Sequence, residues 1–151
     1  MKRFLLMMSI MIAIIIALPF AASANADRDN VEALLDEWLD YADQEDFNVL
    51  DSDVDTVDTE TIMTYTIDLE EGDYIIFAQS GDNIVDLNLA GYHKDDYDEG
   101  NDPFIEDTLD DNVPVLEFTL RHARTLVVTV TPAEFARHKD SGYFCIIFAE
   151  K

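Results

Sequence analysis

Short runs with apolar residues at every second position dominate the chain from residue 63 onward. In the clearest run, residues 83–92, Val85, Leu87 and Leu89 alternate with polar or small residues. This period of two is typical of a strand with one buried face. The same reasoning predicts six strands, at residues 63–69, 74–77, 83–92, 116–120, 126–130 and 143–149. Turn residues separate these runs and no helix is expected after residue 44, so we predict one all-β domain, an antiparallel β-sandwich.

Three details refine this strand prediction. Residues 74–77 are apolar on both faces, which predicts a central strand covered on both sides. The strand at 126–130 is expected to end at Pro132, because proline cannot donate a ladder hydrogen bond. Weaker strand candidates lie at residues 47–50 and 104–108.

One amphipathic helix is expected before the strands and ends near residue 44. Its apolar side chains recur at helical spacing and form one stripe: Val31, Leu34, Leu35, Trp38, Leu39 and Ala42. Asp29 is the predicted N-cap, with Glu32 three residues later. The opposite face carries carboxylates with no Lys or Arg between them, so we expect no ion pairs along the helix. We therefore predict that docking of the apolar stripe holds it in place.

Residues 1–26 have the pattern of a signal peptide. Two basic residues precede an apolar run of 15 residues, 4–18, and small-x-small cleavage sites end at Ala24 and Ala26. A run this short falls below the ~18 residues expected of a membrane-spanning helix, which disfavours an uncleaved anchor. We therefore expect an exported protein, in the periplasm, at the cell surface or in the medium, with no membrane attachment after cleavage.

The charge of the chain is strongly negative, at −24. Residues 27–111 contain 29 acidic and two basic residues, a net charge of −27. Such a surface repels nucleic acid and anionic lipid, so neither is expected as a partner. Cations, basic proteins or adaptation to a saline habitat remain as explanations. Asp outnumbers Glu by 22 to 11, which suits calcium, although a salt-adapted surface would show a similar bias.

An acidic segment follows the strand at 83–92, where residues 93–102 read HKDDYDEGND. Asp, Asn and Gly favour turns, so we predict an irregular loop. Two carboxylates ~4 Å apart near a protein surface repel by about 4 kcal/mol, and a bound cation would relieve that repulsion. We therefore predict one calcium ion, held by a subset of loop carboxylates: Asp95, Asp96, Asp98 and Asp102. Three further carboxylates are expected to share it: Asp51, Asp53 and Asp55.

Three aromatic residues surround this loop: Tyr92, Tyr97 and Phe104. Aromatic faces beside Asp and Asn are common in sites that bind sugars or peptides. The alternative is that these rings only brace their own loop.

The alternating aspartates at residues 51–55 imitate the first half of an EF-hand loop. The pattern fails at Thr56, where an EF-hand needs Gly, and at Ile62, where it needs a bidentate Glu. We therefore expect no EF-hand. The sequence then divides into a signal peptide at 1–26, a helix and acidic linker at 27–60, and a β-sandwich domain at 61–151.

No catalytic arrangement can be recognised. Ser80, Ser141 and Cys145 are the candidate nucleophiles that we weighed, and none lies in a nucleophile-elbow sequence beside a His. Cys145 lies within an apolar strand and is expected to be a small buried hydrophobe. Carboxylates are so numerous that they identify no acid–base pair.

The order of several short motifs resembles the bacterial pre-peptidase C-terminal domain of secreted peptidases. The motifs are Asp86-Leu87-Asn88-Leu89 before a variable loop, the strands at 115–119 and 125–130, and Ser141-Gly142-Tyr143. The resemblance covers residues 62–148 and implies a jelly-roll β-sandwich, here of six to eight strands after one N-terminal amphipathic helix. Collagen-binding modules of clostridial collagenases are similar and bind calcium through acidic residues.

These observations predict an exported, non-catalytic β-sandwich module that is stabilised by a cation and binds a protein or glycan outside the cytoplasm. One alternative is a small secreted hydrolase that uses paired carboxylates. Another is an interaction protein whose acidic face mimics a polyanion.

Overall fold

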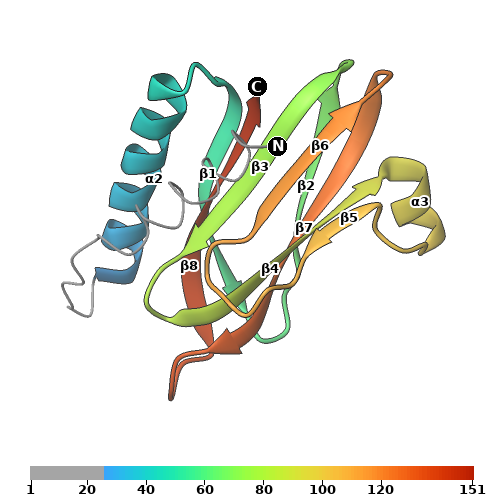
Figure 1. The fold of residues 1–151 in the computed structure, drawn as a ribbon. Coiled ribbons are helices and arrows are strands. Elements are labelled where there is room, and N and C mark those ends of the chain that lie inside the picture. The colour runs from blue at the N-terminus through green and yellow to red at the C-terminus, as the bar shows by residue number, and fades with distance from the viewer. Residues whose placement is uncertain (1–25) are drawn as a thin grey trace.

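The computed structural model describes residues 26–151, so residues 1–25 of the predicted signal peptide lie outside this part of the chain. It contains two four-stranded sheets, both antiparallel, and helix α2 (Ala26–Gln44) packs against one of them (Figure 1). This arrangement confirms the predicted all-β sandwich with one N-terminal helix. Within the described residues, no helix is long and apolar enough to cross a membrane.

The two sheets are built from eight strands. Sheet A has the order β1 (Asn48–Asp58), β8 (Ser141–Glu150), β3 (Gly72–Ser80), β6 (Val115–Leu120). Sheet B has the order β2 (Met63–Leu69), β7 (Arg124–Phe135), β4 (Ile84–His93), β5 (Ile105–Asp107). This order is that of an eight-stranded jelly roll. Both weaker strand candidates belong to it, one at the start of β1 and the other as β5.

The main core lies between the two sheets. Leu87 and Leu89 of β4 point into it, as their alternation predicted, and both are fully buried. They meet Ile76 of β3 and Ile146 of β8 from the opposite sheet. The period of two therefore assigns the inner face of each sheet correctly.

A second core lies between sheet A and α2. Ile75 and Phe77 of β3, with Cys145 and Ile147 of β8, point outward from the sandwich and are buried beneath the helix. Strands β3 and β8 are thus covered on both faces, which confirms the prediction of a doubly buried strand at residues 74–77.

The apolar stripe of α2 is the surface that docks on sheet A. Val31 and Trp38 are buried there, and the Trp38 ring lies 4.6 Å from the Phe77 ring, centroid to centroid. The Trp38 Nε1 donates a hydrogen bond of 2.6 Å to Gln79 Oε1, so the one polar atom of the indole is satisfied in the core. The predicted docking of the helix is confirmed.

Asp27 ties the start of α2 to strand β8 and to the turn between β3 and β4. Its Oδ2 accepts a hydrogen bond of 2.9 Å from the Tyr143 N–H, and its Oδ1 accepts one of 3.4 Å from the Asn83 N–H. A Cβ atom on Gly81 would lie 2.3 Å from Asp27 Oδ1. A side chain at this position would therefore displace the Asp27 carboxylate that fixes the start of the helix.

Two details of the helix prediction are wrong. Helix α2 begins at Ala26, so Asp29 lies inside the first turn and is not the N-cap. The Arg28 Nε also pairs with Glu32 Oε1 at 2.7 Å, an i,i+4 ion pair where none was expected. Both side chains are exposed, so this pair adds little to stability beside the packed stripe.

Two strand predictions also need correction. Part of the expected acidic linker forms β1, which pairs with β8 along its length. The strand was not predicted because the residues that alternate in it are aspartates and not apolar residues. Strand β7 continues through Pro132 to Phe135. Strand β2 pairs with β7 only as far as Val130, so the missing N–H of Pro132 interrupts no ladder on that side.

Replacing Trp38 with Ala tests the docking of the helix. The substitution removes a buried aromatic side chain and leaves Gln79 without its donor, so we expect the free energy of unfolding to fall by about 3–5 kcal/mol. Urea unfolding followed by circular dichroism measures the change. Glu37→Ala, on the exposed face of the same helix, is the matched control and should have little effect. Equal losses in both variants would show that the helix does not dock through Trp38.

Candidate functional site

The acidic segment predicted as an irregular loop contains a short helix, α3 (Lys94–Glu99), which directly follows β4. The Lys94 Nζ pairs with Asp98 at 2.6 Å, four residues later. The helix ends at Gly100, whose φ of 73° lies in the left-handed region that favours glycine. The loop prediction is therefore wrong for this segment, which forms about 1.7 turns of helix closed by a glycine cap.

The predicted calcium ligands fall into two separate groups. Four lie in or just after α3: Asp95, Asp96, Asp98 and Asp102. The other three lie on β1, on the other side of the sandwich (Figure 1): Asp51, Asp53 and Asp55. The structure does not bring the groups together, and no cluster of three or more His, Cys, Asp or Glu within residues 26–151 could hold a metal ion. Calcium binding stays a prediction that rests on charge density.

The three aspartates of β1 cover the free edge of sheet A. Each Oδ1 accepts a hydrogen bond from the following N–H, at 2.9 Å from Ser52, 2.8 Å from Val54 and 2.8 Å from Thr56. Strand β1 pairs with β8 alone in its sheet, so its outward N–H groups would otherwise be open to a further strand. Protection of this strand edge explains why aspartates alternate at residues 51–55, a pattern that resembles a calcium-binding loop in the sequence.

The three aromatic residues around α3 contact other rings. Tyr92 and Tyr97 meet edge to face with centroids 5.3 Å apart. Phe104 stacks on His93 at 4.5 Å and meets Phe118 of β6 at 5.5 Å. These contacts brace α3 and the following loop against the sandwich, which is the alternative that the sequence left open. A ligand-binding role for Tyr92, Tyr97 and Phe104 stays a prediction.

Two of the three candidate nucleophiles, Ser80 and Cys145, have structural roles, whereas Ser141 is exposed at the start of β8. Ser80 is buried and its hydroxyl donates to the Ile84 carbonyl at 2.9 Å. Cys145 is a free, buried cysteine in the core beneath α2, and burial raises the pKa of its thiol to about 12. A thiol with so high a pKa carries almost no thiolate at neutral pH. Cys145 is the small buried hydrophobe that the sequence predicted.

A further acidic patch, which the sequence analysis did not single out, lies at the start of β4. Two register shifts interrupt the pairing of β4 with β7 around Asp86, which lies opposite Glu134. On the other side of β4, the Leu87 N–H donates to the Asp111 carbonyl at 2.9 Å. We call the carboxyl and amide side chains gathered here the β4 patch: Asp86, Asn88, Asp110, Asp111 and Glu134.

Two oxygen atoms in the β4 patch are buried without a hydrogen-bond donor from the described residues, Asp86 Oδ1 and Asn88 Oδ1. Burial raises the pKa of Asp86, and the nearby charges of Asp110, Asp111 and Glu134 raise it further. None of the ion pairs in the described part of the chain includes a patch residue. The patch therefore carries negative charge and acceptor capacity that its own side chains do not neutralise.

One signal for the β4 patch was present in the sequence. The alternation of residues 83–92 placed Asp86 and Asn88 on the outward face of a strand. The contribution of Glu134 comes from pairing between β4 and β7, and that of Asp110 and Asp111 from the path of the chain after β5. Strand pairing cannot be deduced from the period of two.

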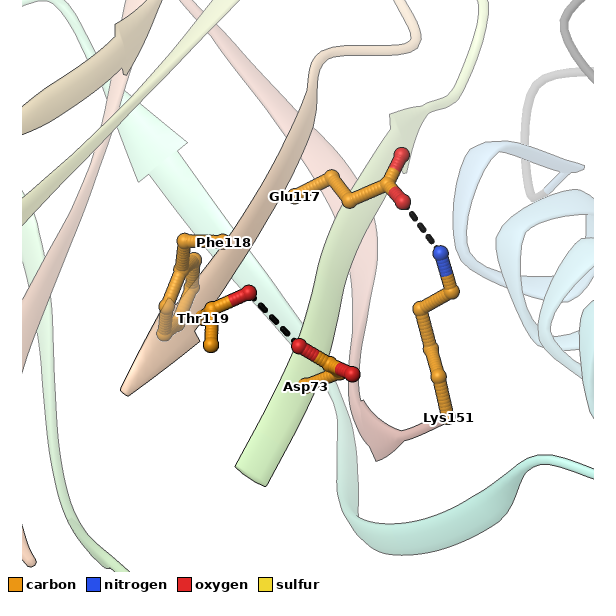
Figure 2. Close-up of a pocket in the computed structure, with 5 residues that line it drawn as sticks. All are labelled: Asp73, Glu117, Phe118, Thr119 and Lys151. Carbon is orange, nitrogen blue, oxygen red and sulfur yellow. Dashed lines mark hydrogen bonds and ion pairs between the residues drawn. The ribbon is translucent and has the colours of Figure 1, made fainter. Parts of the chain in front are cut away.

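A polar pocket of about 360 Å³ lies on sheet A between β3, β6 and the last residue (Figure 2). Asp73 accepts a hydrogen bond of 2.6 Å from the Thr119 hydroxyl, and Glu117 pairs with Lys151. Figure 2 shows that both carboxylates are directed at these partners. The carboxylates of Asp73 and Glu117 therefore both have partners within the chain.

Comparison with known proteins shows the fold only. No protein-family model matches the chain, and no curated protein matches it in sequence. The crystal structure of Aeromonas hydrophila PliG, described as a periplasmic inhibitor of g-type lysozyme, superposes with a TM-score of 0.52 at 10% identity. That match covers 67% of this chain and 85% of PliG.

A second solved structure, the pilus protein of Bacillus endospore appendages, covers 89% of this chain and 98% of that chain at 14% identity. Its TM-score of 0.32 is too low to support an argument. The class defined by the fold is thus an eight-stranded jelly-roll sandwich with an added helix. Its resemblance to the pre-peptidase C-terminal domain stays a prediction.

A thermal melt with different salts tests the calcium prediction. If the carboxylates around α3 bind calcium, millimolar calcium should raise the melting temperature more than magnesium, or sodium at matched ionic strength, because a specific ligand stabilises only the folded state. Asp95→Asn together with Asp96→Asn should remove the difference. Equal effects of all three salts would refute the site and leave screening of a salt-adapted surface.

Replacing Asp86 with Asn tests the electrostatic cost of the β4 patch. The folded state raises the pKa of Asp86, so the ionised carboxylate at neutral pH destabilises the fold. We expect Asp86→Asn to raise the melting temperature at neutral pH. The gain should shrink as the pH falls through the raised pKa, because the wild-type carboxyl then takes up a proton.

Asp82→Asn removes the same charge from an exposed position in the preceding turn and is the matched control. It should change the melting temperature less than Asp86→Asn does. A lower melting temperature for Asp86→Asn would mean that this carboxylate makes a stabilising contact, and would contradict the account of the patch.

Proposed function

We propose that this chain is an exported, non-catalytic module that binds a basic protein outside the cytoplasm through the outer face of sheet B. The observation that carries the proposal is the unequal covering of the two sheets. Helix α2 lies on β8, β1 and β3 and covers the outer face of these three strands of sheet A, whereas β6 lines the pocket of Figure 2. On sheet B, α3 contacts β4 and β7, while Thr64 and Thr66 of β2 stay exposed.

The charge of the chain supports a basic partner. The net charge is −24, and the β4 patch on sheet B adds buried acceptor atoms that no described residue satisfies. Complementary charge speeds association and selects among partners. A cationic protein surface supplies the charge that complements this face.

A protein partner has more support than a glycan. Sites for sugars need exposed aromatic faces. Tyr97 and Phe104 are partly exposed, but Phe104 stacks on His93 and Tyr97 meets Tyr92 edge to face, so each ring already has an aromatic partner. The similarity of fold to PliG supports the same reading, because that protein is described as an inhibitor of an enzyme. The periplasmic location of PliG and the signal-peptide pattern of residues 1–26 support export.

The hydrolase alternative has less support. Its paired carboxylates would need a concave pocket with one acid and one base available. In the polar pocket on sheet A, Asp73 accepts from Thr119 and Glu117 pairs with Lys151. Both groups already have structural partners.

A binding assay with immobilised mature chain, residues 27–151, tests the proposal. The first probe is a g-type lysozyme, and the comparison is a basic non-lysozyme protein with matched net charge. We expect binding to at least one basic protein that saturates and persists at physiological ionic strength, where non-specific attraction is screened. Attraction to every basic protein alike, abolished at physiological salt, would contradict a binding module.

A further inference from the structure

We infer that the free edge of strand β2 accepts an added strand, which is an extended, basic segment of the partner protein. This inference rests on the proposed function and specifies which part of sheet B the partner meets. The added strand would pair with β2 through its main chain and extend sheet B by one strand.

Four strands lie at the edges of the two sheets, and three of them are short or partly covered. On β1, aspartate side chains accept from the outward N–H groups. Strand β5 has only three residues, and the first N–H of β6, that of Val115, donates to Asp107 Oδ2 at 2.8 Å. Short edge strands and covered edges are means by which proteins avoid pairing with another chain.

Strand β2 has none of these protections. Its seven residues pair with β7 without a register shift, and none of them is Pro, Gly or Lys. In the described part of the chain, no main-chain group of residues 63–69 forms a hydrogen bond outside this ladder. A regular, uncovered edge of this length is a template for a further strand.

The side chains on the inner face of β2 are also incompletely covered. Met63, Tyr65 and Ile67 pack against the main core, but all three are only half-buried. On the neighbouring strand β7, the core residue Val128 is fully buried. An added strand would place its own inner side chains beside β2 and bury more of this apolar surface, which favours binding.

The carboxylates of β1 indicate the charge of the added strand. Val57 of β1 belongs to the main core, and alternate residues of a strand share a side. Three carboxylates therefore lie on the side of β1 that faces sheet B: Asp51, Asp53 and Asp55. The Tyr65 hydroxyl of β2 donates to Asp55 Oδ2 at 3.5 Å. Burial raises the pKa of Tyr65, and the charges of these carboxylates raise it further, so all three lie near β2.

These carboxylates are accessible to a cation from another protein. Asp51 and Asp53 are exposed, and the ion pairs found among residues 26–151 include none of the three. Alternate residues are about 6.5–7 Å apart along any strand, so the spacing on β1 equals that on an added strand. Lys or Arg at every second position of the added strand would match the row of aspartates.

A second copy of this chain fits the edge less well. Each copy has a net charge of −24, so two copies repel each other. The β2 strand of a second copy contains one Asp and no Lys or Arg, so it would bring no cation to the aspartates of β1. A basic segment of a different protein supplies both the main chain and the charge.

Hydrogen exchange of the ¹⁵N-labelled mature chain, measured by nuclear magnetic resonance, tests this inference. The probe is a synthetic heptapeptide that alternates lysine with threonine, at physiological ionic strength. Every second amide of β2 already bonds to β7, because alternate N–H groups of a strand point to opposite edges. We expect saturable binding that slows exchange of the remaining β2 amides.

Two N-methylated forms of the peptide separate main-chain pairing from attraction between charges. Each form carries methyl groups on one alternate set of its amides and keeps all its lysines. One set would face β2 and the other would point away from it, so we expect one form to lose binding and the other to retain it.

Variants of the chain test the role of the aspartates. Asp51→Asn together with Asp53→Asn keeps the oxygens that accept from the following N–H groups but removes two charges. We expect the peptide to bind about five- to tenfold more weakly, as the loss of two exposed ion pairs implies. Asp36→Asn together with Asp40→Asn removes two charges from the exposed face of α2 and is the matched control. It should leave the affinity nearly unchanged.

Equal binding of both methylated peptides, or unchanged exchange of the β2 amides, would overturn the inference, because charge alone would then explain the attraction. A dimer of the free chain with its β2 amides protected would make a second copy the occupant instead. If g-type lysozyme binds wild type and Asp51→Asn with Asp53→Asn equally, and leaves exchange in β2 unchanged, the proposed function stands and this site does not.

Discussion

The docking of α2 on sheet A is the interaction on which the rest of the structure depends. Strands β3 and β8 carry apolar residues on both faces, so a two-layer sandwich alone would leave Phe77 and Ile147 exposed to water. The helix buries that surface with Trp38 and is fixed at its start by Asp27. Because α2 covers the outer face of three of the four strands of sheet A, we place the partner on the outer face of sheet B.

Carboxylates have different interactions at three places in the structure. On β1, carboxylates occupy the outward N–H groups of an edge strand and so discourage pairing with another chain. In α3, Lys94 neutralises Asp98 within one helical turn. At the β4 patch, nothing in the described residues pairs with Asp86. The β4 patch lies on the sheet that α2 leaves open, and this is why we place the partner there.

Much of the fold could be predicted from the sequence because the buried face of a strand or helix requires apolar residues at a regular spacing. The alternation around Leu87 and the helical spacing around Trp38 identified the inner face of β4 and the docking face of α2. Strand β1 was missed because its alternating residues are aspartates, which read as a linker or a metal loop. Helix α3 was missed because turn-forming residues outnumber the single Lys94–Asp98 pair that stabilises it.

The candidate site was less accessible to prediction than the fold. Asp86 and Asn88 were assigned to an outward face, but Glu134 reaches them only through pairing between β4 and β7. The predicted calcium ligands failed to converge for the same reason, since β1 belongs to sheet A and α3 contacts β4 and β7 of sheet B. Local pattern predicts which way a side chain points, whereas a site depends on which strands become neighbours.

Amide hydrogen exchange of the mature chain, followed by mass spectrometry, tests most directly whether α2 is an integral layer of the domain. If the helix closes sheet A, peptides from α2, β3 and β8 should exchange slowly and open together, with free energies close to that of global unfolding. Rapid exchange throughout α2, with β3 and β8 still protected, would show that the helix is a detachable arm. That result would contradict the division of the sandwich into one closed face and one open face.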